Sequence, residues 1–152
     1  MKKYQFKKGA HIRVNADVAG QVCEQLEQTV GLTAKNLVDA SRNKDAPLHS
    51  AFEWRDDIAA EAYREQQARH IINCLCLRRE NGEEQPVRMF FKTTDVVYES
   101  LPVILKNEDK HATLLRNALR ELSWFKQKYQ QLTELQPLFE VIEQMGVMKN
   151  AG

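Results

Sequence analysis

The sequence has few of the residues and motifs on which active sites and membrane spans depend. Its 152 residues include only six glycines, too few for a glycine-rich loop that cradles phosphate groups. It also has no G-x-S-x-G, P-loop, H-E-x-x-H or G-x-G-x-x-G motif. No apolar run approaches the ~20 residues that a membrane span needs, and no apolar signal segment opens the sequence. We therefore expect a protein without enzymatic activity, cofactor or membrane contact.

Cysteine is scarce as well, with three residues in a chain long enough to bury a core of its own. An odd, small number does not suggest a disulfide framework, so we expect a cytoplasmic protein. Cys74 and Cys76 form a C-x-C pair on a predicted strand, where both side chains share one face. Zinc sites usually need C-x2-4-C pairs and a second pair of ligands. We expect core cysteines and no metal site.

Charge is balanced overall but unevenly distributed. The 22 basic and 21 acidic residues give a net charge of +1, which argues against a general polyanion binder. Residues 1–13 nevertheless contain five basic residues and no acidic one: Lys2, Lys3, Lys7, Lys8 and Arg13. This asymmetry predicts a flexible basic arm over residues 1–13 that neutralises nucleic-acid phosphates.

Hydrophobic spacing predicts an α+β fold that begins with a helical hairpin. Apolar residues four apart indicate a helix over residues 17–30, with Asn15 or Asp17 as its N-cap. Gly31 suits a left-handed C-cap, and Thr33 can cap a second helix that ends near Ser41. A helix, a glycine-containing turn and a second helix outline a helix-turn-helix.

The rest of the chain predicts a small sheet between helices. The expected elements are a central helix over residues 58–70, a two- or three-stranded antiparallel hairpin sheet within 71–98 that turns at Asn81-Gly82, and two C-terminal helices over 107–132 and 134–145. Gly146 ends the last helix in this prediction. We expect a single domain over residues 14–146, followed by a tail over 147–152.

The second predicted helix and its C-terminal end carry side chains suited to nucleic acid. These are Lys35, Asn36, Arg42 and Lys44. Lysine, arginine and asparagine reach phosphates and base edges in known complexes. The alternative is an ordinary solvated face, because Asp39 lies among these residues and helical hairpins with a glycine turn are common.

The longest predicted helix has an apolar stripe that includes Leu115, Leu119 and Leu122. Such a helix either covers the predicted hairpin sheet or pairs with a second subunit. The block 47–72 adds further aromatic residues, among them Phe52 and Trp54, which we expect to dock a polar loop onto the core.

Four segments resemble a family of small proteins encoded by tailed phages and prophages. They are KKGAHIRVNADVAGQ, LTAKNLVDASR, PLHSAFEWRDDIAAEAYREQQARHII and LRELSWFKQKYQQLTEL, in this order along the chain. In that family an acidic residue follows the tryptophan of the third segment, whereas Arg55 stands here. The resemblance implies a phage origin and a bacterial cytoplasm, and it transfers no activity and no site residue.

Two functions therefore stay open at the level of sequence. The first is a phage accessory protein that binds nucleic acid through the basic arm and the helix-turn-helix. The second is a protein-interaction module or inhibitor that binds a host or phage protein, or a second copy of itself, through the C-terminal helices and the aromatic block.

Overall fold

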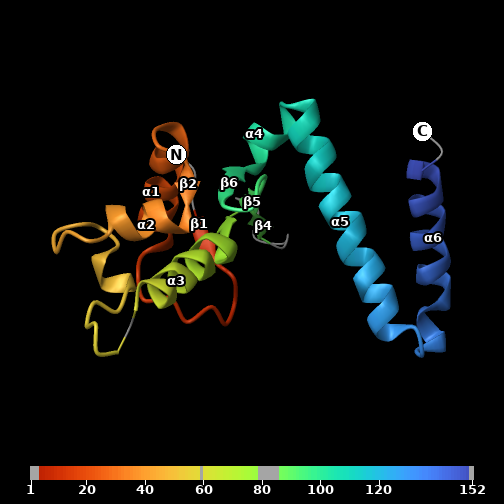
Figure 1. The fold of residues 1–152 in the computed structure, drawn as a ribbon, viewed down its shortest axis with the longest axis horizontal. Helices are drawn as coiled ribbons and strands as arrows, with labels where there is room; N and C mark the ends of the chain where they lie inside the picture. The colour runs from red at the N-terminus through yellow and green to blue at the C-terminus, as the bar shows by residue number, and fades with distance from the viewer. Residues whose placement is uncertain (1–3, 59, 79–85, 151–152) are drawn as a thin grey trace. The chain divides into compact units, whose positions relative to one another are not determined.

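The computed structural model describes residues 4–58, 60–78 and 86–150, with side chains described up to residue 146, and has the α+β fold that the sequence predicts (Figure 1). The chain divides into two units, residues 1–105 and 106–152. The single domain over 14–146 stays a prediction. Strands occur among the described residues of the first unit, whereas those of the second are helical apart from short connections. None of the described helices is both long and apolar enough to cross a bilayer.

Two antiparallel sheets of three strands lie in the first unit. One has the order β1 (Tyr4–Phe6), β3 (Leu75–Leu77), β4 (Val87–Arg88), and the other has the order β2 (Leu32–Thr33), β6 (Val97–Ser100), β5 (Phe90–Lys92). Met89 joins them, because its N–H donates to Leu75 O at 3.1 Å and its carbonyl accepts from Leu101 N at 2.8 Å. The pairing of β3 with β4 confirms the predicted hairpin, whose Asn81-Gly82 turn lies outside the described residues.

The described part of the first unit contains four α-helices and a 3-10 turn. They are α1 (Ala16–Gln28), α2 (Ala34–Ala40), the 3-10 turn η1 (His49–Ala51), α3 (Glu61–Cys74) and α4 (Leu101–Leu105). Asn15 caps α1 by accepting from the N–H of Asp17, and Thr33 caps α2 by accepting from Asn36 N at 3.0 Å. Gly31 has a φ of +90°, which a residue with a Cβ rarely adopts. Thr33 confirms the predicted start of the second helix, whereas α1 ends at Gln28 with Thr29 as its C-cap, two residues before the predicted end.

The prediction of a flexible arm over residues 1–13 is wrong for residues 4–6, and Lys2 and Lys3 lie outside the described residues. Strand β1 pairs with β3, and Tyr4 is only 1% exposed. Its ring lies against Gly20 of α1, and its hydroxyl donates to Glu24 Oε1 at 2.5 Å. The segment is fixed because burying an aromatic ring offsets the entropy lost by ordering a few residues.

Helix α3 begins later than predicted and continues four residues further, to Cys74. The apolar run from Ile71 was predicted to be a strand, but only Leu75–Leu77 form one. Arg64, Ala68, Ile71 and Ile72 are all buried, and their spacing is that of one helical face. A short apolar run cannot be assigned to helix or strand from its periodicity alone. Cys74 therefore ends a helix, and only Cys76 lies on a strand.

The second unit is a helical hairpin formed by α5 (Glu108–Tyr129) and α6 (Gln136–Asn150), which η2 (Thr133–Leu135) connects. Asn107 caps α5, with its side chain accepting from Lys110 N at 3.0 Å. The predicted helix end at Gly146 is wrong, and so is the predicted tail for residues 147–150, because α6 continues to Asn150. Residues 151–152 lie outside the described residues. Gly146 lies inside α6 and does not cap it, and a Cβ at this position would meet none of the described atoms within 4 Å.

Candidate functional site

The polar residues predicted to meet nucleic acid on α2 are occupied by contacts within the protein. Lys35 Nζ lies 2.5 Å from Asp39 Oδ2, one helical turn away. The Asn36 amide donates to Val30 O at 3.2 Å and to Gly31 O at 2.9 Å, which fixes the turn before α2. Asn36 therefore stabilises the turn between α1 and α2, and the Lys35 ammonium already has a carboxylate partner in Asp39.

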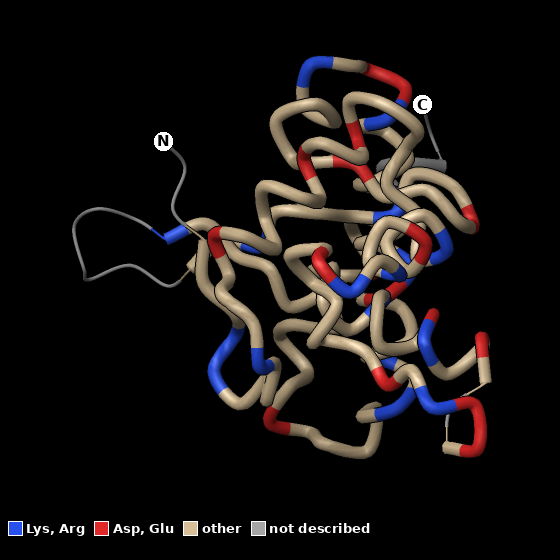
Figure 2. The backbone as a smooth tube through the Cα atoms, turned by 90° about the vertical axis from the view of Figure 1, so that its left-hand side faces the viewer, with Lys and Arg blue, Asp and Glu red and all other residues tan. Residues whose placement is uncertain are grey.

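Arg42 follows the end of α2 and joins it to α3. Its Nε donates to Asp39 Oδ1 at 3.0 Å, and its Nη2 contacts Glu61 Oε1. The Lys35 ammonium and the Arg42 guanidinium hold the pKa of the Asp39 carboxyl below its ordinary value by hydrogen bonding. Two cations thus meet two carboxylates here, so the surface that α2 offers is balanced in charge. Figure 2 shows the same mixture, with basic and acidic segments interspersed along the tube.

The remaining basic residues of the sequence prediction lie apart from this network. Lys7, Lys8 and Lys44 are exposed. Arg13 is exposed too, and it lines a small pocket that three segments of the first unit form. No signal in the sequence brings the members of this pocket together, because they come from positions near 11, 50 and 70.

The aromatic block is mainly structural, as the sequence predicts. Leu48 and Phe52 are buried in the core of the first unit. Trp54 is half-buried and stacks on His49 with the ring centroids 4.8 Å apart, while its Nε1 donates to His49 O at 2.7 Å. The buried guanidinium of Arg64 lies 5.4 Å from the Trp54 ring centroid.

Arg64 holds the loop before α3 onto the core. Its Nε donates to Glu53 O at 2.9 Å, and its two terminal nitrogens contact Asp56 at 2.5 Å and Glu61 at 3.2 Å. Arg55, which follows Trp54, is exposed, and its Nε lies 3.4 Å from Glu53 Oε1. Arg64 thus keeps the loop in place.

The cysteines lie in the core and not in a reactive site. Cys23, Cys74 and Cys76 are free and buried, and burial raises the pKa of each thiol. Among the residues that the structure describes, no three or more histidine, cysteine or acidic side chains converge in a way that could hold a metal ion.

The C-terminal hairpin has more apolar surface than its two helices cover. One face of α6 packs on α5 through Phe139 and Ile142, and the Phe125 and Phe139 ring centroids are 6.5 Å apart. A second face of α6, which we call the outer stripe, consists of Leu138, Val141 and Met145. These three residues are spaced as one side of a helix and are 43–49% exposed.

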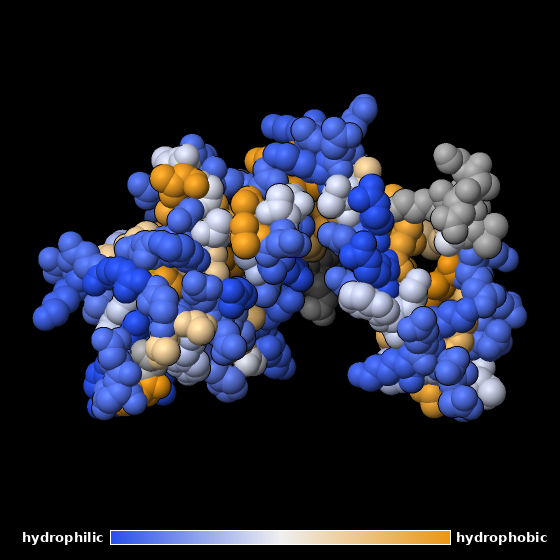
Figure 3. Space-filling model, viewed as in Figure 1, coloured by the Kyte–Doolittle hydropathy of each residue, from blue (hydrophilic) through white to orange (hydrophobic). Residues whose placement is uncertain are grey.

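Helix α5 adds to this surface. None of its 22 residues is buried, and Leu115, Trp124 and Phe125 are exposed. In Figure 1 the helices lie together near their connection and diverge away from it, and Figure 3 shows hydrophobic surface along the space between them. The prediction that the α5 stripe covers the hairpin sheet concerns the placement of the two units and stays a prediction.

Comparison of this chain with protein families, with curated proteins and with solved structures gives no match. The resemblance to tailed-phage proteins therefore stays a prediction that rests on the four segments quoted above.

Proposed function

We propose that this protein is an interaction module that pairs with a second copy of itself through the C-terminal hairpin. The outer stripe of α6 is the observation that carries this proposal. A helix that already packs on α5 through Phe139 and Ile142 has no need of a second apolar face in a hairpin of two helices. Exposed apolar surface of this kind marks sites of protein association.

The size of the unit supports the same conclusion. Residues 106–152 form a two-helix hairpin in which Phe139 and Ile142 are the buried apolar side chains of the described part. Units of fewer than ~70 residues rarely bury enough apolar surface to be stable without disulfides, metals or oligomerisation. Two such hairpins can form a four-helix bundle, the simplest arrangement that buries a second face on each helix.

Charge complementarity favours a second copy as the occupant. Helix α5 has five basic and three acidic residues, whereas residues 133–150 have three glutamates and one lysine. Within one chain, Lys126 of α5 already contacts Glu143 of α6. In a two-fold pair each α6 can also lie against the basic α5 of the other copy, because a two-fold axis repeats every contact.

Nucleic-acid binding through α2 receives less support. The contacts of Lys35, Asn36 and Arg42 with their own chain would have to break before these groups could reach a phosphate or a base. The resemblance to tailed-phage proteins supports placing the proposed module among phage accessory proteins of the bacterial cytoplasm.

Sedimentation velocity tests the proposal. The wild-type protein should sediment as a dimer, and Val141→Asp should convert it to a monomer, because a charge in the outer stripe would be buried without a partner. Gln136→Asp is the matched control: it adds the same charge on the opposite side of α6 and should leave the dimer intact.

A monomeric wild-type protein at micromolar concentration would overturn this proposal. If Val141→Asp instead unfolded a monomeric protein, the outer stripe would belong to the contact between the two units of one chain.

A further inference from the structure

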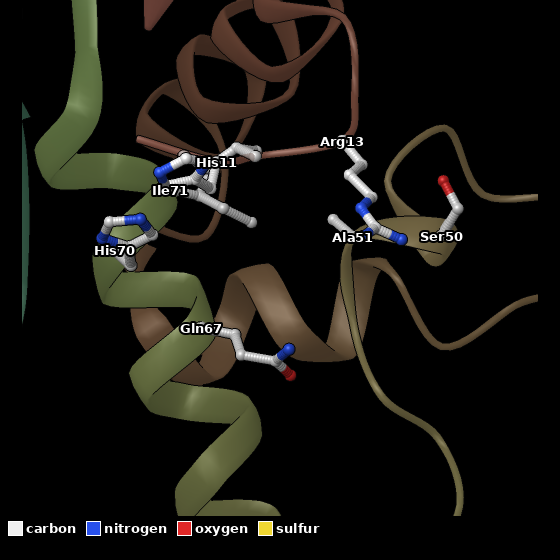
Figure 4. Close-up of a pocket in the computed structure, with 8 residues that line it drawn as sticks. His11, Arg13, Ser50, Ala51, Gln67, His70 and Ile71 are labelled. Atoms are coloured by element: carbon white, nitrogen blue, oxygen red, sulfur yellow. The ribbon is translucent and has the colours of Figure 1, made fainter. Parts of the chain in front are cut away.

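A small pocket in the first unit has the chemistry of an anion site. Three segments meet there: the loop before α1, the turn η1 and the helix α3 (Figure 4). Its polar lining consists of His11, Arg13, Ser50, Gln67 and His70, and its volume is about 220 Å³. No aspartate or glutamate lines it. The pocket therefore combines one permanent cation and several hydrogen-bond donors with no carboxylate.

Arg13 is the cation of this pocket. Among the residues that the structure describes, its guanidinium makes no ion pair or hydrogen bond, in contrast to Arg42 and Arg64. Figure 4 shows Arg13 directed into the space between η1 and α3. A guanidinium presents donors in a planar fork that matches the oxygens of a phosphate or a carboxylate.

Gln67 is oriented so that it adds a donor. Its Oε1 accepts from Glu53 N at 3.2 Å, which leaves the Nε2 amide group to face the pocket (Figure 4). His70 fixes the opposite wall, because its Nε2 lies 2.8 Å from Ala10 O and can donate to it. The side chains on α3 therefore fix both the donor and the loop that carries Arg13.

The backbone of that loop is held in a costly conformation. His11 has a φ of 51°, the one positive value for a residue other than glycine among the described residues. Such a conformation costs a residue with a Cβ on the order of 1 kcal/mol and persists where neighbouring contacts enforce it. The hydrogen bond between His70 and Ala10 is one of these enforcing contacts, and it keeps the His11 ring at the rim of the pocket.

We propose that this pocket binds a phosphate-type oxyanion, with Arg13 as the charge partner and with the Gln67 side-chain amide N–H and the Ser50 hydroxyl as neutral donors. The volume is below the ~300–1,000 Å³ of sites for drug-sized ligands, so the pocket suits one tetrahedral group. The phosphate is either a free anion or one phosphate of a nucleic-acid strand, because both have the same oxygens. The site is independent of the proposed self-association, which involves the other unit.

Titration of the ¹⁵N-labelled full chain with sodium phosphate, against sodium chloride of equal ionic strength, tests the proposal. Saturable shifts should appear at the backbone amides near Arg13 and Gln67. Arg13→Gln should weaken phosphate binding about tenfold or more, because it removes a charge-assisted hydrogen-bond donor. Arg13→Lys should weaken it less, because the charge remains.

Lys8→Gln is the matched control. Lys8 is exposed and does not line the pocket, so its loss removes an equal charge nearby and should leave phosphate binding unchanged. Equal effects of Arg13→Gln and Lys8→Gln would overturn the proposal, as would the absence of saturable shifts in the wild-type protein.

A second titration with a short single-stranded DNA identifies the source of the phosphate. Binding tighter than that of inorganic phosphate, falling with salt and lost in Arg13→Gln, assigns the site to a nucleic-acid backbone. Binding of inorganic phosphate without binding of DNA assigns it to a free anion. Either result supports the oxyanion site.

Discussion

The contact between Tyr4 and Gly20 allows a sharp test of how the N-terminal segment is held. A Cβ at position 20 would meet the Cγ, Cδ2 and Cε2 atoms of the Tyr4 ring at separations that real Cβ atoms do not show. The ring is buried and its hydroxyl is bound to Glu24, so it cannot move aside without loss. Gly20→Ala should therefore force β1 away from α1.

Two opposing effects determine how much Gly20→Ala changes the free energy of unfolding. Replacing glycine by alanine inside a helix contributes about 0.5–1 kcal/mol of stability. Overpacking a filled site costs about 1–3 kcal/mol. Where Tyr4 is present the clash dominates, and Gly20→Ala should lower the free energy of unfolding by up to about 2 kcal/mol. In a Tyr4→Ala background the clash is absent, and the same substitution should raise it by about 0.5–1 kcal/mol.

Urea unfolding followed by tryptophan fluorescence measures this reversal of sign. Trp124→Phe in all variants leaves Trp54 as the reporter of the first unit. The four proteins form a double-mutant cycle, in which contacting residues show a large interaction energy and distant ones do not. If Gly20→Ala stabilises the protein while Tyr4 is present, β1 is not docked and the flexible arm of the sequence prediction stands.

Other substitutions and conditions test separate parts of the structure. Gly146→Ala should raise the thermal stability of the hairpin by about 0.5–1 kcal/mol in circular dichroism melts, whereas a loss would place the helix end at Gly146. Phe52→Ala should lower the free energy of unfolding by about 3–5 kcal/mol, and unchanged stability would show an exposed recognition residue instead. Burial raises the pKa of the Cys23 thiol in the folded state. The protonated thiol therefore contributes fully to the free energy of unfolding at any pH below the pKa of the unfolded chain, which is about 8.5, and this contribution is lost as the pH rises above that value. Urea unfolding from neutral to alkaline pH should show this loss, and Cys23→Ala should reduce it. Cys74 and Cys76 should react slowly with a thiol reagent at neutral pH and fully in urea, and rapid reaction of the native protein would contradict their burial.

Local chemistry made the helix boundaries predictable. Asn15 and Thr33 cap helices as expected, because a cap depends on a side chain and on backbone groups two or three residues away. Gly31 has the predicted positive φ, although it lies in the turn after α1 and not at the C-cap, which is Thr29.

Pairing over long sequence separations could not be predicted in the same way. The strands β1 and β2 have three and two residues, too few to show a period of two, and their partners lie about 70 residues further along the chain. The same limit applies to the candidate sites. Arg42 has a suitable side chain for phosphate, but its contact with Glu61, 19 residues away, decides what it binds.

The pairing of β1 with β3 has a consequence for the order in which the chain folds during synthesis. Tyr4–Phe6 leave the ribosome before their partners Leu75–Leu77, which follow roughly 4–15 s later at ~5–20 residues per second. Leu32 and Thr33 wait for a similar time, until Val97 and Tyr98 emerge. Throughout this time the Tyr4 ring lacks its complete site and two strand edges are unpaired, which is the state in which nascent chains aggregate or bind chaperones. The α5–α6 hairpin forms from neighbouring residues and needs no such delay.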